Sequence, residues 1–223
     1  MMRRAVVFAL VLSVGLAAAA LAADNTPPEG FAALFNGKDF TGWGGKGQAI
    51  APEGDDHWKV EDGTMKFDGK GKTLWTVAKF KDFVLMVDWR FPPGKPGDSG
   101  VFLRGQAKSQ INIWCNAMGS GEVWGYRTDK KMPEEVTKAC TPIKKADKPV
   151  GEWNTFKITM KGEVLNVELN GELVIKDAKL PGVPPEGEIA LQRHGNPIEF
   201  KNIYIQDLSA AAKSTATTKK RGG

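Results

Sequence analysis

Hydrophobic and polar residues alternate along two stretches of the chain, and a period of two is typical of β-strands with one buried face. In residues 83–91, large apolar side chains occupy every odd position, and Pro92-Pro93-Gly94 ends the run. Residues 164–169 repeat the pattern, with leucine or valine at positions 165, 167 and 169. The Asn170-Gly171 pair that follows predicts a two-residue hairpin turn, because both central residues of such a turn need a positive φ. Residues 173–175 then supply the returning strand.

Shorter segments also predict strands, because they combine β-branched and aromatic residues between turns rich in glycine and proline. They are Trp58–Val60, Thr64–Phe67, Val101–Leu103, Ile111–Cys115, Trp153–Met160, Ile189–Leu191 and Ile198–Ile205. Helical periodicity is nearly absent, and only Pro133–Lys138 predicts a helical turn. Many short strands and few helices favour an all-β fold, an antiparallel sandwich of two sheets.

The two ends of the chain differ in composition from the body between them. Residues 1–23 begin with Met-Met-Arg-Arg, continue through an apolar stretch and end in an alanine-rich cleavage region. This order predicts a secretory signal peptide and no membrane span, so we expect a secreted or periplasmic protein. Residues 24–208 form one expected domain. Residues 209–223 are a basic tail with nothing to bury, which we expect to be disordered.

The formal net charge of +5 comes from the two ends. Residues 24–208 carry 25 basic and 26 acidic side chains, so the body of the chain is almost neutral. Domains that bind nucleic acids concentrate positive charge where they meet phosphates. We therefore expect no nucleic-acid partner.

The small number of histidines and cysteines limits the metal sites that the chain can build. Two histidines exclude a three-histidine zinc site and two cysteines exclude a four-cysteine one, whereas an oxygen-ligated Ca²⁺, Mg²⁺ or Mn²⁺ ion remains open. No organic cofactor is expected, since Gly42–Gly47 matches G-x-G-x-x-G without the flanking strand and helix. In an oxidising compartment Cys115 and Cys140 either form a disulfide or remain two free thiols.

One predicted strand presents polar and aromatic side chains on a single face. Gln110, Asn112 and Trp114 alternate with two isoleucines and a cysteine. Planar amides hydrogen-bond to vicinal hydroxyls and indole covers the apolar C–H surface of a sugar, so this face suits a polyhydroxylated ligand. The alternative is that the tryptophans fill the core. His194 stands beside Gly195 at the end of another predicted strand, where a histidine can reach a bound ligand.

Five segments along the domain form a recognisable series. They are GFAALFNGKDFTGW at 30–43, WKVEDG at 58–63, DSGVFLR at 98–104, EWN at 152–154 and GEIALQRHG at 187–195. Together and in this order they resemble a secreted bacterial family described as 3-keto-glucoside lyase/hydratase or 3-keto-disaccharide hydrolase. The resemblance implies a concanavalin A-like jelly-roll sandwich and an oligosaccharide or glycoside substrate.

The chemistry that the resemblance implies is cleavage of 3-keto-glycosides. A ketone at sugar C3 acidifies the C2 proton, so a positioned base can remove it and expel the C1 substituent, after which hydration releases a free keto sugar. His194 or Glu122 is the candidate base. Arg104 or a divalent cation is the candidate stabiliser of the enolate oxygen, and Asp98 the candidate metal ligand or second acid.

We expect the sugar to contact side chains from three neighbouring segments. They are Gln110, Asn112, Trp114, Trp124, Tyr126, Gln192 and Arg193. The chain departs from the family's E-x-Q-x-x-D strand, because Gln110, Asn112 and Cys115 stand at those positions and two carboxylates are missing. This loss favours the alternative of a non-catalytic carbohydrate-binding module on the same fold. A retaining glycosidase would need two acids about 5 Å apart, and no such pair is evident.

Overall fold

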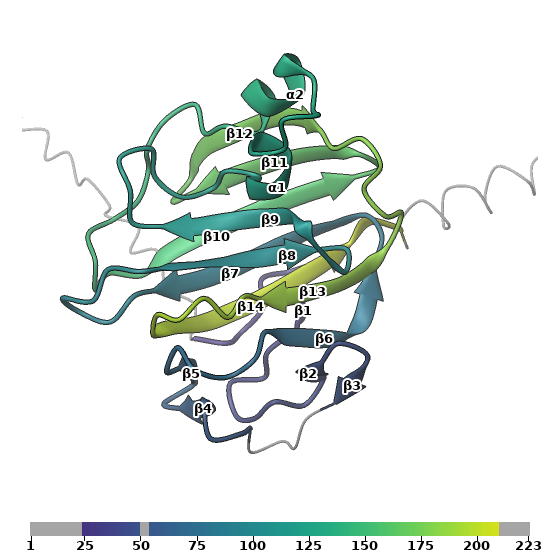
Figure 1. Cartoon of the computed structure of the whole chain (residues 1–223). Helices are drawn as coiled ribbons and strands as arrows, with labels where there is room; N and C mark the ends of the chain where they lie inside the picture. Colours follow the sequence, from purple (N-terminus) through teal and green to yellow (C-terminus); the bar gives the residue numbers. More distant parts are fainter. Residues whose placement is uncertain (1–23, 50–53, 210–223) are drawn as a thin grey trace, which may run out of the picture.

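The computed structural model describes residues 24–49 and 54–209, which form two β-sheets packed face to face (Figure 1). One sheet has eight strands in the order β12-β11-β10-β7-β14-β5-β4, with β1 paired to β14. The other has six strands in the order β3-β2-β6-β13-β8-β9. Each described strand pairing is antiparallel. The predicted all-β fold, an antiparallel jelly-roll sandwich of two sheets, is therefore confirmed.

Each predicted strand recurs in the structure, with boundaries that shift by a few residues. The eight-stranded sheet contains β1 (Ala32–Ala33), β4 (Trp58–Glu61), β5 (Thr64–Phe67), β7 (Phe83–Arg90), β10 (Asn154–Lys161), β11 (Val164–Leu169), β12 (Glu172–Lys179) and β14 (Ile198–Asp207). The six-stranded sheet contains β2 (Trp43–Gly45), β3 (Gln48–Ala49), β6 (Leu74–Phe80), β8 (Asp98–Leu103), β9 (Gln106–Trp114) and β13 (Gly187–Leu191). Two short helices, α1 (Trp124–Arg127) and α2 (Glu134–Ala139), contact β9 and β12 respectively.

The hydrophobic core lies between the two sheets. Phe83, Leu85 and Val87 of β7 have no solvent exposure, as their alternation predicts. Burying one such side chain contributes roughly 1.5–3 kcal/mol. Tryptophans from three strands also belong to this core, namely Trp43, Trp58 and Trp89. The core alternative is therefore correct for these tryptophans, whereas Trp114 and Trp124 stay exposed.

The hairpin between β11 and β12 has the turn that its sequence predicts. Asn170 has a φ of 54° and Gly171 a φ of 81°, so both residues adopt the left-handed conformation. The Asn170 side chain also donates hydrogen bonds to the Ala146 carbonyl at 2.8 Å and to Asn154 Oδ1 at 2.9 Å. The turn thus joins the β11–β12 hairpin to the segment that leads into β10.

Strand β6 and helix α1 are the main elements that the sequence pattern did not predict. The pairing of β6 with β13 shifts register between Glu188 and Ala190, and residues 77–79 are exposed, so β6 lacks a regular alternation. Helix α1 has only four residues, too few to display a helical period. No helix in the described part of the chain is both long and apolar enough to cross a membrane. The predicted signal peptide and the tail from residue 210 onward lie outside the described residues.

Candidate functional site

The six-stranded sheet has an outer face, directed away from the core, on which β8 and β9 place the predicted polar residues. In the register of these strands Asn112 pairs with Gly100, and Trp114 pairs with Asp98. Residues two apart in a strand share a face, so Gln110, Asn112 and Trp114 lie together on the outer face. The intervening isoleucines are fully buried in the core. The prediction that one face of this strand is amide-rich and aromatic is confirmed.

A hydrogen-bond network of amide groups crosses the outer face from β9 to the end of β13. Gln110 Nε2 lies 2.9 Å from Asn112 Oδ1, 2.9 Å from Gln192 Oε1 and 3.3 Å from the Ser99 carbonyl. Asn112 Nδ2 donates to Glu122 Oε1 at 2.8 Å. Gln110 is 5% exposed and Asn112 2% exposed. Because each amide is held by buried partners, the network presents its remaining polar atoms in a fixed arrangement.

The buried carboxylate of Glu122 ends this network. Its side chain has no solvent exposure, and while Oε1 accepts from Asn112, Oε2 pairs with Arg127 Nε. A buried carboxylate whose two oxygens are both occupied does not meet a substrate directly. In this geometry Glu122 positions Asn112 and Arg127, and its role as the base stays a prediction.

Arg127 is a site residue that the sequence analysis missed. It ends α1, and the turn from residue 122 to this short helix brings its side chain back to Glu122. The Arg127 side chain is 26% exposed, and its guanidinium carbon lies 5.8 Å from the centre of the Trp124 ring. The sequence pattern did not indicate this role, since a four-residue helix leaves no periodicity to detect.

Exposed indole rings border the amide network on one side. Trp114 is 36% exposed and Trp124 40% exposed, and their ring centres lie 6.5 Å apart with nearly perpendicular planes. Beyond the network, Trp75 of β6 and Phe102 of β8 have ring centres 5.8 Å apart. Phe102 lies on the outer face because it pairs with Gln110. Aromatic surface therefore lies on both sides of fixed hydrogen-bonding groups, as in sites that bind amphipathic ligands.

A histidine and an aspartate meet at the end of the outer face. His194 Nε2 lies 3.9 Å from Asp98 Oδ2, and the His194 side chain is 51% exposed. Burial raises the pKa of the Asp98 carboxyl, an effect that His194 opposes and that the negative charge of Glu122 reinforces. Asp98 and Asn112 are diagonal neighbours across the strands, which places their Cα atoms about 7–8 Å apart. The His194–Asp98 pair therefore lies at the same outer face as the amide network.

Residues 30–206 match the 3-keto-alpha-glucoside-1,2-lyase-like domain. The chain belongs to this family. A 3-keto-disaccharide hydrolase from Bacteroides thetaiotaomicron is 26% identical over 81% of this chain and 79% of that protein. A crystal structure of a candidate glycosyl hydrolase from Parabacteroides distasonis is 25% identical, with a TM-score of 0.62, and covers 83% of this chain and 100% of that one. A second structure from that species, 23% identical with a TM-score of 0.64, covers 83% and 90% and shows the same fold.

Arg104 connects several loops inside the protein. Arg104 directly follows Leu103, the last residue of β8, whereas Asp98 is the first residue of that strand. The Arg104 side chain is 1% exposed. Its guanidinium donates hydrogen bonds to the carbonyls of Lys81, Gly162 and Pro184 and to Asp82 Oδ1, over distances of 2.7 to 3.1 Å. These contacts favour a structural role for Arg104 in this 3-keto-glucoside lyase-like domain, and its role as a stabiliser of the enolate stays a prediction.

Two further predicted sugar contacts, Tyr126 and Arg193, differ in their exposure to solvent. Tyr126 is 1% exposed, its hydroxyl lies 3.3 Å from the Pro181 carbonyl, and burial raises its pKa. A ring buried in this way favours a structural role, and the contact between Tyr126 and the sugar stays a prediction. Arg193 is exposed, and its backbone N–H donates to Thr73 Oγ1 at 3.2 Å. A contact between Arg193 and the sugar stays a prediction.

The structure also bears on the metal and disulfide expectations. Within residues 24–49 and 54–209, no three His, Cys, Asp or Glu side chains lie close enough together to hold a metal ion. Asp98 has His194 beside it, and a divalent cation held by Asp98 stays a prediction. Cys115 is exposed and Cys140 is buried, and both thiols are free. Burial raises the pKa of Cys140 to about 12.

Replacing Gly100 with alanine should disrupt the amide network. A Cβ at Gly100 would lie 2.6 Å from Gln110 Nε2, so the Gln110 side chain must move away from Gln192 and Asn112. Overpacking of this kind typically costs about 1–3 kcal/mol of unfolding free energy, and we also expect weaker sugar binding. Gly45→Ala is the matched control, because a Cβ there meets nothing within 4 Å. Denaturant unfolding and sugar titration measure both effects, and equal results for the two variants would contradict the prediction.

Proposed function

We propose that this protein is an exported carbohydrate-active enzyme that cleaves 3-keto-glycosides, releasing the free keto sugar. The observation that carries the proposal is the shared face: the His194–Asp98 pair, the amide network and the exposed indoles all border the same surface. Family membership supports the substrate class. Residues 1–23 support export, because they have the charged, apolar and alanine-rich regions of a signal peptide.

Substrate binding follows from the chemistry of the outer face. The amides of Gln110 and Asn112 are almost fully buried, and Gln110 donates to Gln192, so they hold the half-buried Gln192 side chain in place to pair with ring hydroxyls at little cost in conformational entropy. The indoles of Trp114 and Trp124 cover the C–H surfaces of the sugar. These contacts with the amides and indoles hold the reacting carbon of the sugar near the His194–Asp98 pair.

The reaction begins with transfer of the C2 proton of the 3-keto sugar to the neutral imidazole of His194. The electrons of the C–H bond form the enolate at C3, and its collapse makes a C1–C2 double bond while the C1–O bond breaks and the leaving oxygen takes up a proton. Water then adds across the double bond, placing a hydrogen on C2 and a hydroxyl on C1. Asp98 stands next to the imidazole and stabilises its charged form after proton transfer.

We assign to Arg127 the stabilisation of the enolate oxygen that the resemblance implied for Arg104. Its Nε is committed to Glu122, and its other guanidinium nitrogens have no hydrogen-bond partner among the described residues. A guanidinium held by a buried carboxylate is a fixed positive charge, and such a charge stabilises a developing enolate oxygen more than it stabilises the ketone. The proposal assigns no step to a metal ion.

The experiment that tests this function compares a 3-keto disaccharide with its unoxidised parent. Only the keto sugar has an acidified C2 proton, so it alone should be cleaved, while the parent should bind without turnover. Release of the free sugar is followed by chromatography. Binding of both sugars with equal affinity and cleavage of neither would contradict the enzyme and favour a carbohydrate-binding module.

A further inference from the structure

The proposed reaction gives a bound 3-keto-glycoside one direction along the outer face. C2 lies at His194, and the C3 oxygen faces Arg127, whose partner Glu122 is hydrogen-bonded to β9. C1 is the other ring neighbour of C2, so C1 and C3 lie on different sides of His194. The leaving group on C1 therefore extends away from β9, across β8 and β13 toward β6, which is the order of these strands in the sheet.

A row of paired outer-face residues leads from β8 to β6. Phe102 of β8 pairs with Ala190 of β13, and Ala190 pairs with Trp75 of β6. Paired residues share a face of the sheet, and Leu74 beside Trp75 belongs to the core, so the Trp75 indole lies on the outer face. Three strand spacings place β6 about 14 Å from β9. Trp75 therefore stands on the side of the site opposite Arg127.

Trp75 and Phe102 form an aromatic platform at this end of the row. Their ring centres lie 5.8 Å apart, and neither side chain belongs to the hydrophobic core between the sheets. Ala190 stands between them in the row, and its small side chain lets the two larger rings approach. Trp75 is half-buried, so part of its indole remains open to a ligand. Such a surface suits the apolar C–H face of a second sugar ring.

Lys46 reaches over the same part of the outer face from the turn between β2 and β3. Its Nζ lies 4.9 Å from the centre of the Trp75 ring and donates a hydrogen bond to the Gly105 carbonyl. Gly105 lies beyond the end of β8 that is opposite Asp98, so the ammonium bounds the platform on the side remote from the His194–Asp98 pair. An ammonium carries three N–H donors, and those that remain can pair with sugar hydroxyls.

The start of β6 is fixed to the segment that carries the candidate base. The backbone N–H of Arg193 donates to Thr73 Oγ1 at 3.2 Å. Thr73 stands two residues before Trp75, and Arg193 directly precedes His194. Backbone contacts between β13 and β6 therefore set the position of the platform relative to the base.

We propose, on the basis of the cleavage reaction above, that Trp75 and Lys46 bind the leaving group and that this group is a second sugar ring. The C–H face of that ring packs on the Trp75 indole, and its hydroxyls accept hydrogen bonds from Lys46 Nζ. The substrates are then 3-keto disaccharides, and glycosides of small alcohols bind less tightly. Trp75 is a specificity-determining residue, because it contacts only the part of the substrate that leaves.

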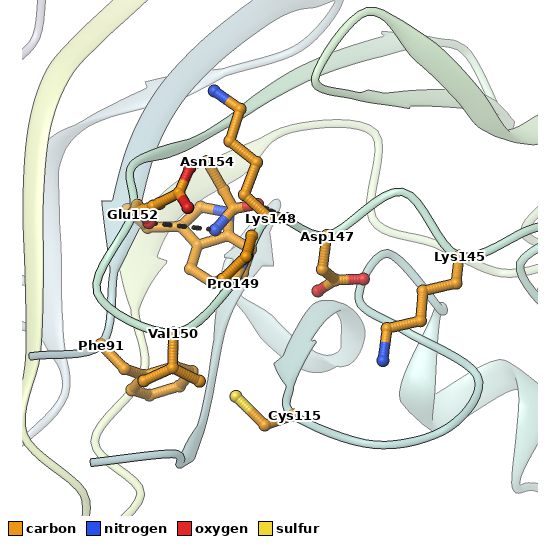
Figure 2. Close-up of a pocket in the computed structure, with 10 residues that line it drawn as sticks. Phe91, Cys115, Lys145, Asp147, Lys148, Pro149, Val150, Glu152 and Asn154 are labelled. Atoms are coloured by element: carbon orange, nitrogen blue, oxygen red, sulfur yellow. Dashed lines mark hydrogen bonds between the residues drawn. The ribbon is translucent and has the colours of Figure 1, made fainter. Parts of the chain in front are cut away.

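A cavity of about 350 Å³ offers the leaving group a different direction, beyond the end of β9. Figure 2 shows the Cys115 sulfur in its wall, turned toward Phe91 and Val150. Cys115 directly follows Trp114, so this cavity borders the β9 side of the outer face. A leaving group that extends toward β6 does not enter it. The exposed Cys115 thiol therefore reports on binding in the opposite direction.

The first test measures binding of unoxidised sugars by titration calorimetry, because these sugars bind without turnover. We expect at least one of maltose, trehalose and sucrose to bind about tenfold more tightly than methyl α-glucoside, the order of one stacked aromatic contact. Trp75→Leu keeps apolar packing on Phe102 but removes the flat ring, so this preference should disappear while the affinity for methyl α-glucoside is unchanged. Equal affinity of the wild-type protein for all four sugars would overturn the proposal.

Three further variants make this result specific. Val77→Ala changes a residue of the same strand that is 51% exposed, so it should behave as the wild-type protein. Lys46→Ala, at an exposed position, should reduce the disaccharide preference about threefold through the loss of one hydrogen bond. Trp124→Ala should weaken binding of all four sugars equally, because Trp124 faces the ring that stays. Melting curves verify that each variant is folded.

The second test separates this proposal from the cleavage reaction. Trp75→Leu should lower kcat/KM about tenfold for the 3-keto form of the preferred disaccharide and leave that of methyl 3-keto-α-glucoside unchanged. Equal losses for both substrates, or a loss for neither, would overturn the leaving-group site and leave the reaction standing. Cleavage of neither substrate by the wild-type protein would contradict the reaction, while the binding preference would still decide whether Trp75 holds a second sugar.

Alkylation of Cys115 by iodoacetamide, followed by mass spectrometry, tests the direction of binding. The preferred disaccharide should protect Cys115 no more than methyl α-glucoside does, whereas stronger protection would place the second sugar beyond β9 and overturn the proposal. Cys140 is buried, and its pKa is raised to about 12, so it does not react near neutral pH.

Discussion

Replacing His194 with glutamine should lower kcat for a 3-keto disaccharide by about 10²–10⁴-fold, the usual contribution of a positioned general base. The imidazole Nε2 lies 3.9 Å from Asp98 Oδ2 at the edge of the outer face, and glutamine retains polarity without accepting the proton. Because the side chain is 51% exposed, the substitution should leave the fold intact. Steady-state kinetics with a keto disaccharide and a melting curve measure the two effects separately.

The chain offers a matched control in its other histidine. His57 is 38% exposed, and its Nδ1 lies 3.0 Å from Asp68 Oδ2, so it also forms an exposed pair with an aspartate. His57→Gln should leave kcat unchanged, because His57 lies outside the amide network and its neighbours. If His194→Gln retained wild-type kcat with the keto sugar, His194 would not be the base.

Replacing Arg104 with alanine should lower the free energy of unfolding by about 3–5 kcal/mol, the usual cost of removing one partner of a buried ion pair. The variant leaves Asp82 without its guanidinium partner and three carbonyls without their donors. Since Arg104 lies beyond the far end of β8 from Asp98, the kcat of the folded fraction should be retained. Denaturant unfolding gives the first quantity, and kinetics at low temperature give the second.

An exposed arginine serves as the reference for this stability effect. Arg193→Ala should change the free energy of unfolding by no more than about 0.5 kcal/mol, as is usual for surface positions. A stable Arg104→Ala variant with a large loss of kcat would support the catalytic role that the resemblance implied for Arg104. A strong loss of stability with unchanged kcat would establish its structural role.

The amino-acid sequence by itself determined the fold class and one face of the site. The alternation in residues 83–91 and 164–169 sorts side chains between core and solvent within a single strand, and the Asn170-Gly171 turn depends on only two φ angles. The same local rule put Gln110, Asn112 and Trp114 on one face, since neighbouring side chains of a strand point to opposite sides. Each of these features depends on residues close together in the chain.

Only the tertiary structure decided what the charged and aromatic side chains do. Arg104 and Arg127 both follow hydrophobic segments. The hydrogen-bond partners of Arg104 lie up to 80 positions away in the chain, and they bury its side chain. Arg127 instead pairs with Glu122, a carboxylate five residues before it, at the outer face. Glu122 became a buried anchor and Tyr126 a core residue for the same reason. Burial and ion pairing are set by which distant segments pack together, and strand periodicity carries no information about that choice.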